Sequence, residues 1–272
     1  MTSGPIFDIL PGKVNDERTP HLINPLRALL FSDWDIESLL LNVDPTREDD
    51  FSFMVASIQA GQLEEAEEWL ANEISNYPWV LMAAAHVKLK MEEAAEAGRL
   101  LRAVTLISNE ARLRLWAWHN LRQLGKYPSP DLSRQVLGVV IEVPYGDEAG
   151  RTGAGANIRH DVLAAYADGT ARYINHQGGM IVWDRTDEPI TPLVMNVIRE
   201  SAPIGAPQED RNDDPVPPEE VRLSVMTPGG IHVWQGPAAD NPALSKVFAG
   251  MADLLRALVQ LTIDQRREED EE

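Results

Sequence analysis

The sequence predicts an α+β protein in which a stack of helical hairpins precedes an antiparallel sheet covered by helices. Two internal repeats support this prediction. The stretch Gly178–Trp183 recurs fifty-one residues later as Gly229–Trp234, and Leu63–Ala66 recurs twenty-eight residues later as Met91–Ala94. The first repeat has the pattern of a strand that follows a tight Gly-Gly turn. The second lies among apolar residues at three- and four-residue spacing, which is typical of helices.

These repeats divide the chain into four parts. The parts are a leader with short helices at 1–50, a helical-hairpin domain at 51–126, an α+β domain at 131–265 with a flexible acidic insert at 203–220, and an acidic tail at 266–272. Within the leader, Pro25–Leu30 and Asp33–Leu41 have the apolar spacing of short helices. Asp44-Pro45 ends the second helix, because the residue before proline avoids the helical conformation.

The helical-hairpin domain begins near Phe51, and Gly61 and Lys90 mark the turns between its helices. The run 60–66, Ala-Gly-Gln-Leu-Glu-Glu-Ala, resembles the turn and second-helix start of tetratricopeptide repeats, and the resemblance covers residues 51–125. It implies a stack of helical hairpins, a type that commonly binds peptides or helices. A generic helical bundle is the alternative.

The last predicted helix of this domain, Ala111–Leu124, has two apolar stripes and contains no acidic residue. Two stripes need cover on two sides, so we expect the helix to lie between the helical stack and the chain that follows. Our candidate partner-binding residues are its basic and aromatic side chains, Arg112, Arg114, Trp116, Trp118 and Arg122. Such residues can also stack bases and hold phosphates. The alternative is that the arginines pair with leader acids such as Asp33, Asp35 and Glu37.

The α+β domain is predicted to contain four strands, a helix, two strands and a final helix. The first three strands are Val136–Val143, Val162–Ala167 and Thr170–His176. Asp168-Gly169, the strongest short hairpin signal in the chain, joins the second strand to the third. In each copy of the repeat a helix follows, with Thr191 or Asn241 as its N-cap and proline at the first helical position. The final helix has one apolar face, from Leu244 to Thr262, that is long enough to cover a sheet.

The duplication makes a geometric prediction. Residues 178–200 and 229–251 form strand-loop-helix units related by an approximate two-fold axis, and Trp183 and Trp234 lie on the same face of the sheet. We interpret the two tryptophans as matched core anchors, and the alternative is that they line a binding groove.

Charge and composition narrow the function classes. The net charge is −19, and −9 of this charge lies in two segments: 208–220, with six acids and one base, and 264–272, with six acids and two bases. We expect both segments to be solvated and mobile, because they have too few apolar residues to offset the entropy of ordering them. A negative chain disfavours nucleic acid and favours a basic protein partner.

The cysteine count and the hydropathy pattern indicate the cellular compartment of the protein. The chain has no cysteine, which excludes disulfides and thiolate chemistry. It also has no apolar run of the roughly 18–20 residues that a membrane span requires, and no signal-peptide pattern at its start. These features predict a cytoplasmic protein that does not enter a membrane.

Signals for catalysis are scarce. The Gly-rich loop at 150–155 does not match a phosphate-binding loop, because the Lys-Ser/Thr pair is absent, and no Gly-x-Ser-x-Gly motif occurs. No two of the six histidines have the spacing that places a pair on one helical face. His160-Asp161, His176 and His232 form the one set that could converge across strands as a metal site. We predict no metal and no cofactor.

The sequence therefore predicts a non-catalytic protein-binding adaptor or scaffold whose partner, another protein, is held by the helical half or by the sheet face. One alternative is an acidic inhibitor or immunity-type protein that masks a basic toxin or nuclease. A second alternative is an enzyme without a recognisable motif. The oligomeric state does not follow from the sequence.

Overall fold

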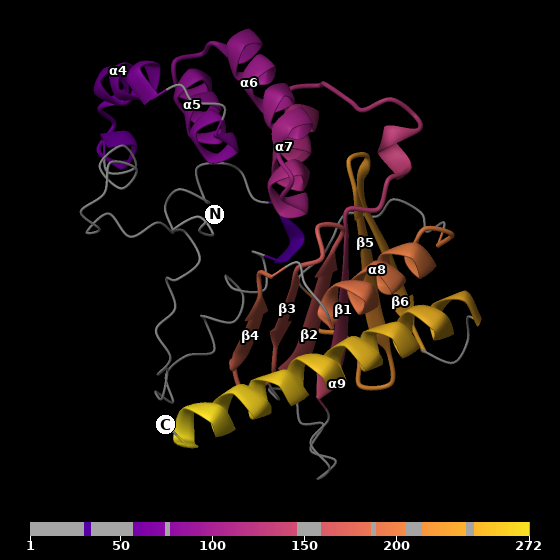
Figure 1. The fold of residues 1–272 in the computed structure, drawn as a ribbon. Coiled ribbons are helices and arrows are strands. Elements are labelled where there is room, and N and C mark those ends of the chain that lie inside the picture. The colour runs from indigo at the N-terminus through magenta and orange to yellow at the C-terminus, as the bar shows by residue number, and fades with distance from the viewer. Residues whose placement is uncertain are drawn as a thin grey trace. The chain divides into compact units, whose positions relative to one another are not determined.

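The computed structural model describes residues 30–33, 57–73, 77–145, 159–185, 189–204, 214–237 and 242–271 (Figure 1). The chain divides into two compact units, 1–129 and 130–272. The first unit contains stacked helices, and the second contains an antiparallel sheet packed with helices. The predicted α+β class is therefore confirmed. The predicted leader helices and the Gly-rich loop at 150–155 lie almost entirely outside the described residues.

The first unit contains four helices with both ends in the described residues, and these four pack in chain order. Their bounds are α4 Leu63–Glu73, α5 Pro78–Lys90, α6 Ala94–Ile107 and α7 Ala111–Gln123. Helix α5 packs against α4 and α6, and α6 packs against α7. Pro78 occupies the first turn of α5, where its fixed backbone angle suits a helix start and its missing N–H is not needed. Each helix thus buries its apolar face against its neighbours in the chain.

The turns that precede α4 and α6 have the same backbone design. In the first turn, the N–H of Gln62 donates to the carbonyl of Ser57 at 2.8 Å, and Gly61 has a φ of +76°. In the second turn, Glu92 has a φ of +62° and takes the place of the glycine, and an equivalent hydrogen bond of 2.8 Å closes the turn. This is the Schellman arrangement, in which the left-handed residue after a helix is usually glycine.

The turn geometry corrects the register of the helical repeat. The sequence aligned Leu63–Ala66 with Met91–Ala94 at a spacing of twenty-eight. The structure instead places Gly61 and Glu92 at equivalent positions, thirty-one residues apart, and α6 begins at Ala94. The predicted register was wrong by three residues, because the repeated Glu-Glu-Ala letters start a helix in one copy and form the turn in the other.

We expect Glu92→Gly to stabilise the helical unit by about 0.5–1 kcal/mol, because glycine adopts the left-handed conformation without the cost that a Cβ imposes. Gly61→Ala should have the opposite sign. Nothing lies within 4 Å of a Cβ added at Gly61, so its cost comes from the backbone alone. Chemical denaturation of the two variants measures both changes, and a shift of the same sign in both would contradict the shared turn design.

The second unit follows the predicted order of four strands, a helix, two strands and a helix. The bounds are β1 Gly138–Tyr145, β2 Arg159–Tyr166, β3 Ala171–Ile174, β4 Met180–Trp183, α8 Ile190–Ser201, β5 Val221–Thr227, β6 Gly230–Gly236 and α9 Pro242–Glu271. Within the described residues, the strands form one antiparallel sheet in the order β4-β3-β2-β1-β5-β6. Helices α8 and α9 pack against each other and cover the same face of the sheet (Figure 1).

The hydrophobic core of this unit lies between the helix-covered face and the two helices. Alternate residues of a strand point to the same face, which is why every second strand residue contributes. The strand contribution is Val139, Ile141, Leu163, Ala165, Ala171, Trp183, Leu223 and Val225. The helix contribution includes Val194, Val197, Leu244, Val247, Met251, Leu254 and Leu258. The apolar face predicted for the final helix is therefore the face that covers the sheet.

The predicted duplication is visible in the strand pairing. Exchanging β4, β3 and β2 for β6, β5 and β1 maps Trp183 and its partner Ala171 onto Trp234 and its partner Leu223. Both tryptophans pack on the core cluster, so both face the helices. The antiparallel pairing of β1 with β2 is what a two-fold axis between these strands requires. The prediction that both tryptophans lie on one face is confirmed.

The two copies differ in local detail. Trp183 and Trp234 are fifty-one residues apart, but Ala171 and Leu223 are fifty-two residues apart, so the first hairpin is one residue longer. Helix α8 begins at Ile190, which places Thr191 inside its first turn rather than at the N-cap. The corresponding predicted cap, Asn241, lies outside the described residues.

The second face of the sheet is buried at its centre, and part of the acidic insert lies against it. Val216 is buried, and its backbone N–H donates to Nε2 of His160 on β2 at 3.0 Å. The carbonyl of Asp214 accepts a hydrogen bond of 2.8 Å from Arg222 on β5. The sequence predicted that the whole insert 203–220 is mobile. For residues 214–220 that prediction is wrong, because one apolar anchor and one arginine hold the segment; residues 205–213 are not described.

The acidic tail also differs from its prediction. Helix α9 continues to Glu271, so residues 266–271 extend the final helix instead of forming a separate tail. Five of the six residues at 266–271 are Arg or Glu, which have good helix propensity, and this is why charge alone does not end the helix. None of the helices in the described ranges has the length and apolar content needed to cross a bilayer.

Candidate functional site

The predicted partner-binding residues lie on α7, but their aromatic side chains are not on the surface. Trp116 is 1% exposed and Trp118 is 2% exposed. Arg112 is buried, and Arg114 and Arg122 are half-buried. A partner cannot reach the two indole rings in this conformation. The tryptophans belong to the core of the helical unit, and the set does not form an open docking surface.

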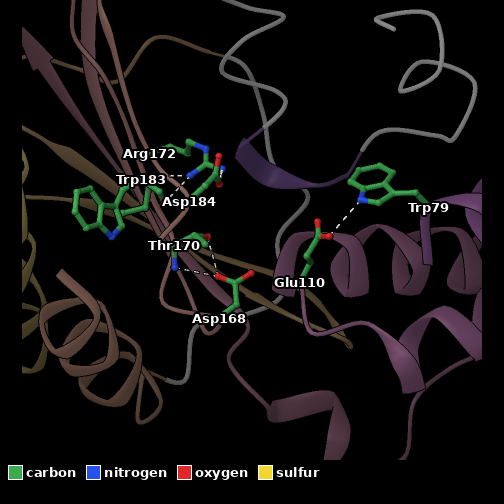
Figure 2. Close-up of polar contacts among 8 residues, drawn as sticks. Trp79, Glu110, Asp168, Thr170, Arg172, Trp183 and Asp184 are labelled. Carbon is green, nitrogen blue, oxygen red and sulfur yellow. Dashed lines mark hydrogen bonds and ion pairs between the residues drawn. The ribbon is translucent and has the colours of Figure 1, made fainter. Parts of the chain in front are cut away.

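A third tryptophan, which the sequence did not single out, connects α5 to α7. The rings of Trp79 and Trp116 meet edge to face with centroids 5.8 Å apart. Figure 2 shows the indole Nε1 of Trp79 donating to Oε1 of Glu110 at 3.2 Å, just before α7 begins. The one sequence signal for Trp79 is its position after Pro78, and that signal says nothing about its partner in α7.

Arg122, near the end of α7, interacts electrostatically with an acidic residue of the leader. Burial lowers the pKa of the Arg122 guanidinium, and the negative charge of Asp33 opposes this effect. This agrees with the alternative in which α7 arginines are balanced by leader acids. Asp35 and Glu37, the other acids of that prediction, lie outside the described residues.

Three polar groups meet at the carboxylate of Asp161 on β2. This carboxylate accepts hydrogen bonds from the hydroxyl of Tyr173 at 3.1 Å and from the backbone N–H of His176 at 2.7 Å. The ring Nδ1 of His176 also lies 3.0 Å from it. The cluster therefore ties the turn after β3 to β2.

The predicted four-residue metal set is only partly brought together. Asp161 and His176 meet, whereas His160 lies on the other face of the sheet and bonds to Val216. His232 lies on β6, separated from β2 by β1 and β5. The described ranges hold no group of three side chains suited to bind a metal ion.

The ionisation of Tyr173 favours a structural role for this cluster. Burial raises the pKa of Tyr173 to about 12, and the charge and hydrogen bond of Asp161 add to the effect. The phenol is therefore protonated at neutral pH and donates to the carboxylate. A general base needs a pKa near the operating pH, which Tyr173 does not have.

We expect one tyrosine of this protein to ionise only near pH 12. The pKa of Tyr173 is higher in the folded protein than in the unfolded chain, so the folded state holds its proton more tightly. This contribution to stability is complete below about pH 10 and is lost as the pH rises from about 10 to 12. Absorbance titration of the phenolate should show the late transition, and Tyr173→Phe should remove it. A Tyr173→Phe titration curve that keeps the late transition would contradict the assignment.

A second polar cluster is centred on Arg222, on the face of the sheet opposite the helices. Arg222 and Glu142 are 1% and 0% exposed, and Nη1 of Arg222 lies 3.5 Å from Oε2 of Glu142. Nε of Arg222 donates to Gln235 at 3.0 Å, and Gln235 in turn donates to Glu220 at 2.7 Å. With the bond to the Asp214 carbonyl, this network holds both ends of residues 214–220. Its groups are bonded to one another, which suits a structural role.

A third cluster fixes the end of β4. Arg172 on β3 donates from Nη1 to the carbonyl of Trp183 at 3.0 Å and pairs with the carboxylate of Asp184 (Figure 2). Arg172 is buried, so this ion pair is shielded from water on the arginine side. In the preceding turn, Asp168 accepts hydrogen bonds from the backbone N–H and the hydroxyl of Thr170 (Figure 2). Arg172 thus fixes the end of β4 against β3, and Asp168 closes the turn between β2 and β3.

Strand β4 itself is an edge of the sheet and exposes apolar side chains. Within the described residues it pairs only with β3. Met180 and Val182 are 37% and 39% exposed. Both lie on the face opposite the helices, because Ile181 and Trp183 pack on the core cluster and strand residues alternate.

The backbone N–H and C=O groups of Met180 and Val182 take no part in the ladder with β3. In the turn before β4, the N–H of Asn175 donates to the carbonyl of Gly179 at 2.8 Å, which makes this a hydrogen-bonded pair. Hydrogen-bonded and non-hydrogen-bonded pairs alternate along an antiparallel ladder. The pairs of β3 with Met180 and Val182 are therefore of the second kind. Their N–H and C=O groups point away from β3, toward the open side of the sheet.

Comparison with known proteins gives no relative for this chain. No protein-family model, no curated protein and no solved structure matches it. The resemblance of residues 51–125 to tetratricopeptide repeats thus stays a prediction.

Proposed function

We propose that this chain is a non-catalytic protein-binding scaffold that receives a partner along β4. The observation that carries the proposal is an edge strand with exposed apolar side chains and outward backbone groups at Met180 and Val182. Sheets usually protect such edges with charged residues, prolines or bulges, and β4 contains none of these protections within its four residues. An extended segment of a partner gains main-chain hydrogen bonds and side-chain contacts at such an edge.

The polar clusters support a binding function more than a catalytic one. The groups around Asp161, Arg222 and Arg172 bond to neighbouring strands, turns and the segment 214–220. Each cluster fixes a structural element in place. In particular, Arg172 bonds to the carbonyl of Trp183, so the end of β4 is held in place without a partner. Such preorganisation lowers the entropic cost of binding.

The helical unit offers a second candidate surface. Leu106 and Ile107 at the end of α6 are exposed, as is Tyr77 immediately before α5. Helices α5 and α6 form a hairpin, which brings the start of α5 to the same end of the unit as the end of α6. Together these three residues form an exposed apolar surface, and this surface fits the predicted adaptor role of the helical half.

Co-purification from the native host at physiological salt tests the proposal. The wild-type chain is compared with Val182→Lys, which places a charge on the edge strand, and with Met195→Lys, a matched change at an exposed residue of α8. We expect a partner to be recovered with the wild type and with Met195→Lys, at a yield at least tenfold higher than with Val182→Lys. Equal recovery with all three proteins would place the partner on another surface, such as the end of the helical unit, and would overturn the proposed role of β4.

A further inference from the structure

We infer that the segment bound at β4 is an extended stretch of the partner with alternating apolar residues and with lysine or arginine at its end. This inference rests on the proposed function and names the chemistry of the partner. It follows from two features that surround β4: the apolar surface on each side of the strand, and the negative charge at the end of α9.

The first feature is apolar surface on both sides of the edge. On the face opposite the helices, Met180 and Val182 are exposed. On the helix-covered face, α9 packs against β4 and runs beyond it (Figure 1). Leu258 is the last buried residue in the described part of α9, and Val259 and Ile263, one turn apart, are exposed. A seventh strand beside β4 would direct alternate side chains to the two faces of the sheet, on the side of Met180 and Val182 and on the side of α9.

The second feature is the negative charge at the end of α9. Residues 264–272 carry six acids and two bases. Because α9 is helical to Glu271, this acidic stretch continues from the apolar residues Val259 and Ile263 rather than moving away as a separate tail. The negative end of the helix dipole adds to the charge. A partner segment that lies along β4 and passes this helix end is therefore favoured when basic residues flank its apolar core.

The charge also argues against a second copy of this chain as the occupant. Pairing β4 of two molecules would bring two chains of net charge −19 together. Their acidic helix ends would repel each other, and this repulsion is strongest at low salt. A partner with basic residues has the opposite balance, since its charge is attracted to the same helix end.

Synthetic peptides provide the test, with fluorescence anisotropy as the readout on the full chain. The probe is a ten-residue peptide of three Thr-Val repeats between two pairs of lysines. Its matched controls have glutamate pairs at the ends, or proline in place of the central threonine. We expect binding of the lysine peptide to be at least tenfold tighter than that of either control, and to weaken as salt is raised.

Two protein variants locate the site. Val182→Pro removes an N–H that points away from β3, so it leaves the β3–β4 ladder intact but blocks pairing on the open side. We expect it to reduce affinity at least tenfold with an unchanged circular dichroism spectrum. Deleting residues 266–272 should weaken binding of the lysine peptide and leave that of an uncharged Thr-Val peptide unchanged. Val182→Lys serves as a second edge variant if the proline variant unfolds.

The outcomes separate this inference from the proposed function. Equal affinity for lysine- and glutamate-flanked peptides, or no binding of any peptide, overturns the basic-segment inference; the edge function then stands if the native partner is still lost with Val182→Lys. If neither the native partner nor the peptide responds to changes at Val182, both are overturned. Concentration-dependent dimers that Val182→Pro abolishes would assign the edge to a second copy and overturn the inference as well.

Discussion

Replacing Arg222 with alanine should destabilise the sheet unit by about 3–5 kcal/mol, which is the typical cost of leaving one partner of a buried ion pair unbalanced. Arg222 and Glu142 are almost completely inaccessible to water, and the variant would leave the Glu142 carboxylate buried without its cation. It would also remove the hydrogen bonds to Gln235 and to the carbonyl of Asp214. Urea denaturation of the full chain, followed by circular dichroism, measures the loss in the transition of the sheet unit.

A double variant tests the electrostatic origin of this loss. Replacing Arg222 with methionine and Glu142 with leucine removes both charges and keeps most of the side-chain volume. Removing a whole buried ion pair in this way is often neutral or stabilising, because the desolvation penalty disappears with the charges. We therefore expect the double variant to be clearly more stable than Arg222→Ala. Equal losses would show that the packing and the bonds to residues 214–220 dominate, not the unbalanced charge.

The Arg222→Ala variant also tests how residues 214–220 are held against the sheet. Arg222 holds the Asp214 carbonyl directly and Glu220 only through Gln235, whereas Val216 bonds to His160, so loss of the arginine should loosen the segment most at residue 214. Hydrogen exchange of the backbone amides should rise at residues near 214 more than at the Val216 amide. A uniform rise over the whole segment would mean that the Val216 contact depends on Arg222.

Local patterns in the sequence were enough to predict the framework of the sheet unit. The Asp168-Gly169 turn, the Gly-Gly turns and the apolar face of α9 are each encoded within a few residues, and the structure has a hairpin or a helix at each. The matched positions of Trp183 and Trp234 were also predictable, because two copies of one segment are expected to form the same strand pairing. These features need no knowledge of distant contacts.

Features that depend on distant contacts were not predictable. The ion pair of Glu142 and Arg222 joins residues eighty positions apart, and each lies inside a strand whose other residues are mostly apolar. The segment 214–220 looked solvated because its average composition is acidic and Pro-rich, but the burial of the single residue Val216 is enough to anchor it. Composition averages over a segment and cannot show where one residue docks.

The candidate binding surface was missed for a related reason. The sequence drew attention to α7, where Trp118 and its neighbours are conspicuous residue types, yet these side chains form a core. Strand β4 is part of the duplicated motif, and its sequence gives no sign that the strand lies at an edge. That position follows from the order of all six strands. An edge is a property of the topology, and topology needs the long-range pairings that the sequence does not display.

Trp118→Ala should cost the helical unit about 3–5 kcal/mol, the range for emptying a large aromatic site in a core. Trp118 is 2% exposed, and the guanidinium of Arg102 on α6 lies 6.0 Å from its ring centroid, so the alanine variant loses packing and a cation–π contact together. Leu106→Ala is the matched control on α6, because that leucine is 79% exposed and its loss should change stability by less than about 0.5 kcal/mol.

A phenylalanine variant separates packing from the indole N–H. In the part of the chain that the structure describes, Nε1 of Trp118 is buried without a hydrogen-bond partner, so Trp118→Phe removes an unsatisfied donor while keeping most of the ring. We expect it to lose clearly less stability than Trp118→Ala, since relief of the buried donor offsets part of the cavity cost. Thermal melts followed by circular dichroism rank the three variants. If Trp118→Ala and Leu106→Ala have the same melting temperature, the ring of Trp118 lies at the surface. Trp118 would then again be a candidate contact residue for a partner.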